Sequence, residues 1–129
     1  MEGRDVGAFA DAGRTLFSLG LVKGSEGNLS TWDGHELQIT RSGCELGTIR
    51  TEDVVTGTLD DPPSDASTDL LLHIARYRER GPGAVAHAHP AGTVPRDWIE
   101  GMHHGDYAFA PTLADAVAEI VRRAREAAS

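Results

Sequence analysis

Apolar residues recur with helical spacing in three parts of the chain, and each part predicts an amphipathic helix. Residues 5–19 place their apolar side chains on one broad face and stop at Gly20, a residue typical of helix ends. The side chains assigned to this face are Val6, Phe9, Ala10, Leu16, Phe17 and Leu19. Residues 68–80 and 111–128 show the same period, so we expect a second helix in mid-chain and a third at the end.

Shorter apolar runs bounded by turn-forming residues predict strands between these helices. Asp33-Gly34 is a hairpin signal, so the strand within GSEGNLSTWD should pair with the strand at 35–40. Residues 52–59 predict a third strand, or a short turn followed by a strand. Residues 84–89 predict a further strand, and residues 102–110 predict one strand or two short ones.

Length and composition narrow the class of protein. Strands that alternate with single helices in 129 residues favour one α/β domain covering residues 1–129. The net charge of −8 and the aromatic content of 5% argue against a nucleic-acid partner, because a protein that binds nucleic acid needs a basic or base-stacking surface. No run of about 18 apolar residues is present, so we expect no membrane span. The single cysteine, Cys44, cannot form an internal disulfide, which fits a cytoplasmic protein.

Two histidines close the apolar run in the segment GAVAHAHPAG. Alternate residues of a strand point to the same face, so His87 and His89 should project together. Neutral imidazole is a common ligand of Zn²⁺, and a catalytic zinc site typically has three protein ligands with one open position. The same pattern also fits two polar residues at a strand end beside Pro90, so a metal site requires a further ligand.

Four other histidines are candidates for that ligand. His35 follows the hairpin turn and is expected to be solvated, and His73 lies in mid-helix, where it can border the core. His103 and His104 are adjacent, so in a strand only one of them can face the site. Because this pair follows the His-x-His strand closely in the sequence, one of the two is the natural third ligand.

An acid and three loops of small residues complete the candidate chemistry. Asp69 lies in the first turn of the predicted helix, either as a general acid/base or as an acid near the positive end of the helix dipole. The segments GNLS (27–30), TRSG (40–43) and AST (66–68) are rich in small polar residues. The last of them begins a helix, where free N–H groups favour an anion, although each segment alone also fits a turn or an N-cap.

Taken in order, these pieces resemble the class II aldolase/adducin family, which includes fuculose-phosphate and ribulose-phosphate aldolases. The resemblance rests on the segments GSEGNLSTWDGHELQITRSGCELG, SDASTDLLLHIARYRERGPGAVAHAHP and HHGDYAFAPTLADAVAEIVRRA, and it covers nearly the whole chain from residue 20 onward. The family pattern has a Gly-Asn-x-Ser strand, an Ile-Thr-x-Ser-Gly loop, a Ser-Ser-Glu helix start and a His-x-His-Pro strand. The resemblance implies an α/β/α-type sandwich around a mainly antiparallel sheet.

The resemblance also implies which residues form the site. His87, His89 and His104 match the metal ligands of the family, whereas His103 takes the position of an asparagine that is not a ligand. Asp69 takes the position of the catalytic glutamate. The positions that match the phosphate-binding residues are Asn28, Ser42, Gly43, Ser67 and Thr68.

The function implied by the resemblance is that of a metal-dependent lyase of the aldolase type. Its substrate would be a small phosphorylated or carboxylated carbonyl compound, converted through a metal-stabilised enediolate. Zn²⁺ is the expected metal, with Mn²⁺, Fe²⁺ or Co²⁺ as alternatives, because the ligand type alone does not select among them. The resemblance further implies a homo-oligomer, a tetramer in typical family members.

The chain departs from the family pattern in three places. Asp69 is one methylene shorter than glutamate, and a shift of about 1 Å can lower a rate by roughly a hundredfold. Only residues 90–103 separate His89 from His104, where the family has a longer segment, so we expect a compact variant with an internal deletion. The C-terminal tail of the family, which often contributes a tyrosine, has no counterpart in this sequence. Another metal-dependent reaction (decarboxylase, isomerase, dehydratase or iron-dependent oxygenase) or a non-catalytic role therefore stays open.

Overall fold

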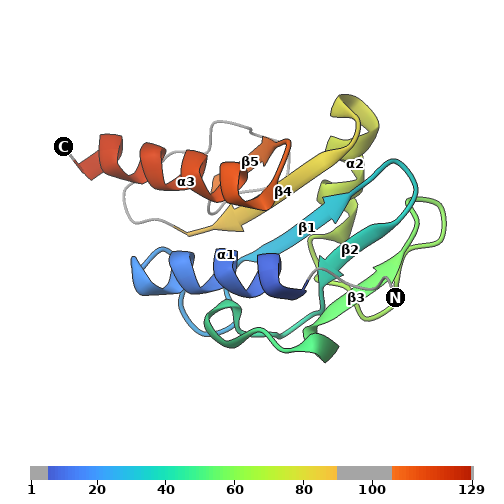
Figure 1. Ribbon diagram of the computed structural model, residues 1–129, viewed down its shortest axis with the longest axis horizontal. Helices are drawn as coiled ribbons and strands as arrows, with labels where there is room; N and C mark the ends of the chain where they lie inside the picture. The colour runs from blue at the N-terminus through green and yellow to red at the C-terminus, as the bar shows by residue number, and fades with distance from the viewer. Residues whose placement is uncertain (1–5, 90–105, 129) are drawn as a thin grey trace.

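The computed structural model describes residues 6–89 and 106–128, which form a sheet with flanking helices (Figure 1). The elements in chain order are α1 (Val6–Ser18), β1 (Asn28–Trp32), β2 (Leu37–Thr40), η1 (Leu46–Thr48), η2 (Thr51–Asp53), β3 (Val54–Gly57), α2 (Leu70–Arg80), β4 (Gly83–Ala88), β5 (Asp106–Ala110) and α3 (Leu113–Ala128). All three predicted helices are present with slightly shorter bounds, and each predicted strand region contains a strand.

The five strands follow the order β3-β2-β1-β4-β5, and each neighbouring pair is antiparallel. This order confirms the expected antiparallel sheet. The predicted hairpin joins β1 to β2, and Asp33 Oδ1 accepts hydrogen bonds from the backbone N–H groups of His35 (2.8 Å) and Glu36 (2.6 Å). Residues 52–59 adopt the second predicted arrangement, in which the short turn η2 leads into β3.

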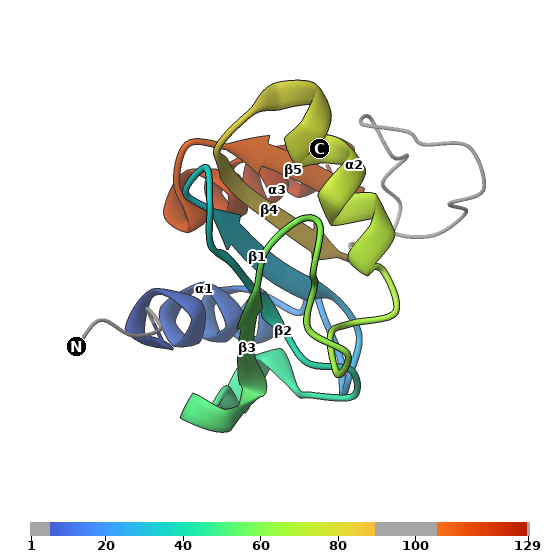
Figure 2. The same cartoon turned by 90° about the vertical axis from the view of Figure 1, so that its right-hand side faces the viewer.

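Helices cover both faces of the sheet, so the α/β/α sandwich is confirmed. Figure 1 shows α1 and α3 in front of the strands, where they contact each other. Figure 2 shows α2 on the opposite face. Two separate clusters of buried apolar side chains correspond to these layers, a larger one under α1 and α3 and a smaller one under α2.

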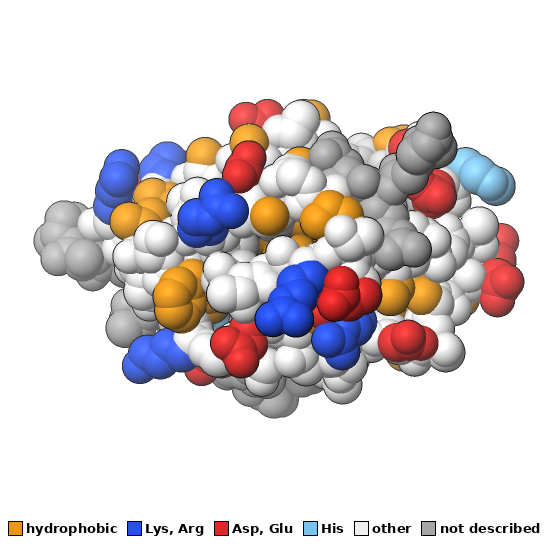
Figure 3. All heavy atoms as spheres, turned by 60° about the horizontal axis from the view of Figure 1, so that its bottom comes forward, with side chains coloured by type: hydrophobic (Ala, Val, Ile, Leu, Met, Phe, Trp, Pro, Cys, Tyr) orange, Lys and Arg blue, Asp and Glu red, His pale blue; other side chains and the backbone are white. Residues whose placement is uncertain are grey.

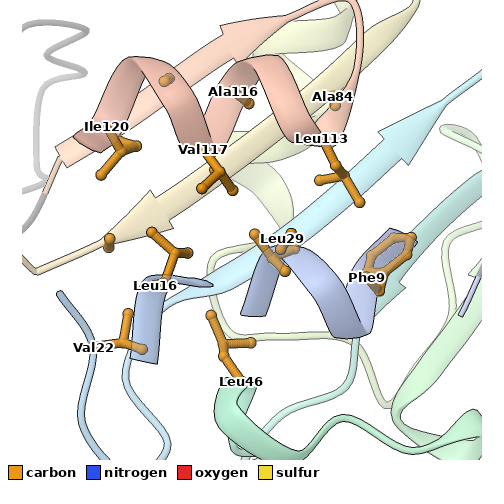
Figure 4. Packing of buried hydrophobic residues seen from close by; sticks show 14 of the residues in the cluster. Phe9, Leu16, Val22, Leu29, Leu46, Ala84, Leu113, Ala116, Val117 and Ile120 are labelled. Atoms are coloured by element: carbon orange, nitrogen blue, oxygen red, sulfur yellow. The ribbon is translucent and has the colours of Figure 1, made fainter. Parts of the chain in front are cut away.

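The layer under α1 and α3 is packed from apolar side chains. Figure 4 shows Leu16 of α1, Leu29 of β1 and Ile120 of α3 pointing toward one another, and all three are fully buried. Burying one such side chain contributes about 1.5–3 kcal/mol to folding. A Cβ atom at Gly13 would lie 2.1 Å from the carbonyl oxygen of Leu46, so only glycine allows this close contact between α1 and η1.

The predicted core face of α1 is only partly right. Phe9 and Leu16 are fully buried as expected, but Phe17 and Leu19 are 52% and 50% exposed. The helix instead turns Gly13 inward, against η1. The helical period located a broad apolar face correctly, but it could not locate the centre of that face, since the neighbouring η1 is remote in sequence.

The layer under α2 mixes apolar and polar side chains. Ile74 and Tyr77 of α2 pack in one cluster with Val85 of β4. Ser30 and His73 are fully buried in the same layer. Buried polar groups in folded proteins are almost always hydrogen-bonded, so this layer must contain internal partners for both side chains.

The outer surface of the described residues has no single dominant charge on the side that Figure 3 presents. Acidic and basic side chains alternate there with small apolar patches. None of the helices in residues 6–89 and 106–128 combines the length and the apolar character that a membrane span requires.

Candidate active site

Three strand ends meet at one end of the sheet. Because β1 runs antiparallel to both β2 and β4, the start of β1 at Asn28 lies beside the ends of its two neighbours. The register pairs Asn28 directly with His87 of β4. This pairing places the side-chain amide of Asn28 and the first of the two candidate histidines side by side on adjacent strands.

The loop after β2 and the segment before α2 are joined by their backbones. Ser67 N donates to the carbonyl of Thr40 at 3.0 Å, and Ser42 N donates to the carbonyl of Asp65 at 2.8 Å. These bonds hold the start of α2, and therefore Asp69, beside the strand ends. Two of the small-residue segments identified in the sequence, TRSG and AST, thereby become neighbours.

A cavity of about 250 Å³ lies between the strand ends and the start of α2. Every predicted site residue within the described ranges lines it: Asn28, Ser42, Gly43, Ser67, Thr68, Asp69, His87 and His89. His103 and His104, the candidates for the third metal ligand, lie outside the described residues. The structure thus gathers residues from four separate segments around one cavity.

His87 and His89 lie close together, as the strand pattern predicted. Their ring centroids are 4.7 Å apart, and His87 is buried whereas His89 is partly exposed. The Nδ1 atom of His87 lies 3.0 Å from Asp69 Oδ2. The ring of His87 also stacks on Tyr107 of β5, with centroids 3.7 Å apart, so this imidazole is fixed on two sides.

These two histidines fit a metal centre. Metal-bound histidines usually donate their second ring N–H to a carboxylate, and the pairing of His87 with Asp69 has that arrangement. Within residues 6–89 and 106–128, no three histidine, cysteine, aspartate or glutamate side chains are grouped so as to hold a metal ion. That range does not contain His104, the ligand that the sequence resemblance implies as the third.

Asp69 is the N-cap residue of α2, yet its side chain makes no capping hydrogen bond. Its Oδ2 atom instead accepts hydrogen bonds from Asn28 Nδ2 at 2.8 Å and from the Tyr107 hydroxyl at 3.0 Å, in addition to its contact with His87. The hydrogen bond from His87 is the main reason that the pKa of Asp69 lies far below its usual range. Asp69 is therefore a fixed anion, which the helix-dipole interpretation alone did not predict.

His73 is fully buried, so the expectation that it borders the core is wrong. Its Nδ1 atom lies 2.6 Å from Ser30 Oγ, and its Nε2 atom is hydrogen-bonded to Asn28 Oδ1. Burial lowers the pKa of His73 to about 3, so the ring is neutral. His35, in contrast, is exposed at the hairpin as predicted.

Gly27 allows the backbone at the start of β1 to lie against the backbone at the end of β4. It has φ +81°, a conformation that favours glycine, and a Cβ atom there would lie 2.7 Å from the carbonyl oxygen of His87. A larger residue would push the end of β4 away from the start of β1. The position next to Asn28 is therefore restricted by the site's own geometry.

Sequence reasoning did not select three residues that the structure places at the site. Arg41 lines the cavity, and its Nε atom donates to Asp53 at 2.7 Å. Its place inside the TRSG segment was a usable signal, because a cation suits a predicted phosphate loop. Tyr107 gave no such signal. Cys44 also lines the cavity, but burial raises its pKa to about 11, so it is not a reactive thiolate.

A larger groove of about 780 Å³ lies between α1 and α3. Its described lining consists mainly of small apolar side chains with a few charged groups at the rim, and it contains no histidine or cysteine. We assign the chemistry to the smaller cavity, because among the cavities of the described residues it is the one lined by two histidines and by a carboxylate in contact with one of them.

A sequence model of the class II aldolase and adducin N-terminal domain matches residues 7–96. The chain belongs to this family. The class II aldolase domain thus includes β1 to β4 and all of the predicted site residues up to His89. Family membership confirms the resemblance that the motifs indicated.

Two curated relatives are about one-third identical to this class II aldolase domain over the residues that align. A 5-methylthioribulose-1-phosphate/5-deoxyribulose-1-phosphate aldolase of Rhodospirillum rubrum is 37% identical over 89 residues, which is 65% of this chain and 40% of the relative. A probable bifunctional methylthioribose-1-phosphate isomerase/methylthioribulose-1-phosphate dehydratase of Nocardia farcinica is 34% identical over 86 residues, 62% of this chain and 16% of the relative. The chain therefore spans less than half the length of both relatives.

Solved structures support the fold over almost the whole chain. The L-fuculose-1-phosphate aldolase of Thermus thermophilus superposes with a TM-score of 0.80 at 24% identity, covering 95% of this chain and 90% of that one. The N-terminal class II aldolase domain of a Thermoplasma acidophilum protein superposes with a TM-score of 0.69 at 16% identity, covering 99% and 94%. At these identities the likeness concerns the fold.

Proposed function

We propose that this chain is a metal-dependent lyase of the aldolase type that acts on a small phosphorylated ketose. The observation that supports this most directly is the convergence of eight predicted site residues, from four segments of the chain, on one cavity. Unrelated turns, caps and strand ends would have no reason to share a cavity. Membership of the class II aldolase family agrees with the proposal.

His87, His89 and His104 would hold the divalent ion in this proposal, with Zn²⁺ as the first candidate and Mn²⁺, Fe²⁺ or Co²⁺ as alternatives. A bound divalent ion would act as a Lewis acid that polarises the substrate carbonyl. Asp69 would keep His87 in a fixed orientation through the contact at Nδ1.

The phosphate would bind at the opposite side of the cavity, where the TRSG loop meets the start of α2. Ser42, Gly43 and Thr68 are exposed to the cavity and offer hydroxyl and backbone donors. Ser67 Oγ already accepts a hydrogen bond from Asp69 N at 3.2 Å, so it also stabilises the helix start. Arg41 adds the cation that a phosphate dianion requires.

Asp69 would move the proton during carbon–carbon bond cleavage. Its hydrogen bonds reach Oδ2, and among the described residues Oδ1 accepts none. Oδ1 therefore remains for the substrate at the cavity wall. Asn28 was expected to contact the phosphate, but its described polar contacts go to Asp69, His73 and the ring of His87, so its main role is to hold Asp69.

Elemental analysis of the purified chain tests the metal centre. We expect about one divalent ion per chain, lost in His87→Ala and in His89→Ala. His35→Ala is the matched control, since His35 is exposed at the hairpin and should leave the metal content unchanged. A wild-type protein that takes up none of Zn²⁺, Mn²⁺, Fe²⁺ or Co²⁺ after incubation would contradict the proposal.

Product analysis tests the reaction. Aldol cleavage of a ketose 1-phosphate releases dihydroxyacetone phosphate and an aldehyde, whereas dehydration releases water and keeps the carbon chain intact. Asp69→Asn should bind the metal about tenfold more weakly, because the carboxylate that holds His87 is lost, and at saturating metal it should lose about 10²–10⁴-fold in turnover, the usual effect of removing a proton-transfer group. Unchanged turnover in Asp69→Asn would exclude Asp69 from that role.

A dehydratase acting on the same class of substrate is the second candidate. The relative from Nocardia farcinica, matched at 34% identity, is described as a methylthioribulose-1-phosphate dehydratase. Dehydration begins with removal of the C–H proton next to the carbonyl, and aldol cleavage begins with removal of the hydroxyl proton on the far carbon of the bond that breaks. Both reactions form an enediolate at the carbonyl carbon and its neighbour, so one cavity suits either of them. Loss of water without release of dihydroxyacetone phosphate would decide for the dehydratase.

We also propose that the protein assembles as a homo-oligomer, with a tetramer as the first expectation, because class II aldolases are typically oligomeric. Light scattering coupled to size-exclusion chromatography tests this directly. A mass corresponding to the 13.7 kDa monomer at micromolar concentration would contradict it. A cytoplasmic location stays a prediction from the single cysteine.

A further inference from the structure

A chain of buried hydrogen bonds runs from the core under α2 to the candidate active site. The Tyr77 hydroxyl lies 2.7 Å from Ser30 Oγ, and Ser30 Oγ lies 2.6 Å from His73 Nδ1. His73 Nε2 is hydrogen-bonded to Asn28 Oδ1, and Asn28 Nδ2 lies 2.8 Å from Asp69 Oδ2. In each of these contacts except the last, either of the two groups could be the donor.

The last contact fixes the direction of all the others. A carboxylate has no proton, so Asn28 must present its NH₂ group to Asp69 and its oxygen to His73. His73 must then donate from Nε2, which leaves Nδ1 as an acceptor for the Ser30 hydroxyl. Ser30 Oγ donates its only proton to His73, so in its contact with Tyr77 it can only accept. The Tyr77 hydroxyl is therefore the donor. Every donor therefore points toward the cavity.

The same rule sets the proton on the second buried histidine. His87 Nδ1 lies 3.0 Å from Asp69 Oδ2, which can only accept, and 3.3 Å from Asn28 Nδ2, which can only donate. The shorter contact, to a carboxylate that needs a donor, assigns the proton to Nδ1, and Asn28 Nδ2 then donates to Asp69. The lone pair of His87 then lies on Nε2. His73 has the opposite arrangement, with its proton on Nε2 and its lone pair on Nδ1.

We propose that Tyr77, Ser30 and His73 are positioning residues that fix the orientation of the Asn28 amide, and that the two buried histidines consequently adopt opposite tautomers. A flipped Asn28 amide would turn its oxygen toward the Asp69 carboxylate, and two acceptors would then face each other. The chain prevents this flip. It thereby holds Asp69 against His87, so that Nε2 of His87 remains the ligand atom in the proposed metal centre.

Burial supports this arrangement independently of the proposed function. Ser30 and His73 are fully buried, and Tyr77 and Asn28 are 1% and 4% exposed, so water cannot replace a missing partner. Burial also keeps the His73 ring neutral by lowering its pKa to about 3. A buried neutral ring between two polar neighbours has one donor and one acceptor, and this chain uses both.

Tautomers can be measured without any assay of activity. Long-range ¹H–¹⁵N correlation spectra of the ¹⁵N-labelled protein at neutral pH distinguish a ring protonated on Nδ1 from one protonated on Nε2. We expect His73 to be the Nε2–H tautomer and Nδ1 of His87 to be protonated, with assignments from His73→Gln and His87→Ala. An Nδ1–H tautomer or an imidazolium at His73 would overturn the proposal.

A matched pair of substitutions tests the positioning role. His73→Gln keeps an N–H near the place of Nε2, whereas the shorter His73→Asn cannot reach Asn28 Oδ1. This part rests on the proposed metal centre, and Co²⁺ titration is the readout. We expect His73→Asn to weaken Co²⁺ binding about tenfold or more, and His73→Gln to recover most of it. Equal losses in the two variants would contradict the role.

Control measurements separate this inference from the proposed function. Thr31→Val alters the neighbouring residue on β1, outside the chain of hydrogen bonds, and should leave Co²⁺ affinity unchanged. A wild-type protein that binds none of Zn²⁺, Mn²⁺, Fe²⁺ and Co²⁺ would refute the metal centre, while the tautomer of His73 would still decide whether the chain of hydrogen bonds exists. Expected tautomers together with metal binding that is insensitive to His73→Asn would overturn the positioning role alone.

Discussion

The two faces of the sheet are held together by different kinds of contact. Under α1 and α3, the buried side chains form one large apolar cluster. Under α2, a smaller apolar cluster lies beside the buried polar side chains of Asn28, Ser30 and His73. The first layer depends on area and shape, whereas the second requires each donor to meet an acceptor.

This difference separates stability from chemistry within one small molecule. A substitution under α1 and α3 should change how firmly the chain folds without reaching the cavity. A substitution under α2 should change the cavity as well, because the polar side chains of that layer lead to Asp69. The following measurements test whether the two layers are as separate as the contacts indicate.

The largest expected effect belongs to the apolar layer. Leu16→Ala removes a fully buried side chain between α1 and the sheet and should lower the free energy of unfolding by about 2–5 kcal/mol. Leu19→Ala, one position beyond the end of α1 and 50% exposed, should change it by about 0.5 kcal/mol or less. Urea denaturation measures both. A loss of metal affinity in the folded Leu16→Ala protein would show that the layers are coupled.

The polar layer should make stability depend on pH. The pKa of His73 is lowered to about 3 by burial, against 6.5 for a free histidine, so below pH 6.5 the unfolded chain binds a proton that the folded chain does not. Stability is therefore lost as the pH falls from 6.5 toward 3, by about 1.4 kcal/mol per pH unit at most. Urea denaturation of metal-free protein at several pH values measures this.

His73→Gln is the reference for that measurement, because glutamine does not titrate. The difference between wild type and His73→Gln should shrink as the pH falls through the same range. Parallel curves for the two proteins would mean that carboxylates, and not His73, dominate the acid sensitivity. That outcome would contradict the assignment of the pH dependence to the polar layer.

The smallest effect is expected at Tyr107, where the two kinds of contact meet. Its ring stacks on His87 and its hydroxyl donates to Asp69 at 3.0 Å. Tyr107→Phe keeps the ring and removes the donor, so metal affinity should fall by about tenfold. Isothermal titration with Zn²⁺ measures the change. Phe109→Leu on the same strand is the control, and an equal loss there would indicate a general disturbance of β5.

Much of the fold could be predicted from the sequence, because local patterns of residues determine it. The helical period gave α1, α2 and α3, and Asp33-Gly34 gave the hairpin between β1 and β2. The exposed positions of Phe17 and Leu19 were not accessible, since they depend on the contact of Gly13 with Leu46. That contact joins segments whose approach no local pattern encodes.

The candidate site divides in the same way. His87 and His89 were visible from strand alternation, and Asp69 and the small-residue loops were visible from their order along the chain. The buried role of His73 was not visible, because its partner Ser30 lies on another element, 43 positions away. Tyr107 was missed for the same reason, since nothing around it in the sequence indicates Asp69 as its partner.

The pairing of Asn28 with His87 has a consequence for the order of events in folding. These two residues are 59 positions apart, and the contacts of both with Asp69 add a third segment. Closing such long loops is entropically unfavourable, and proteins dominated by distant contacts fold slowly. The described part of the site forms only when residues from 28 to 89 have come together, so we expect its appearance during refolding to report the pairing of β1 with β4.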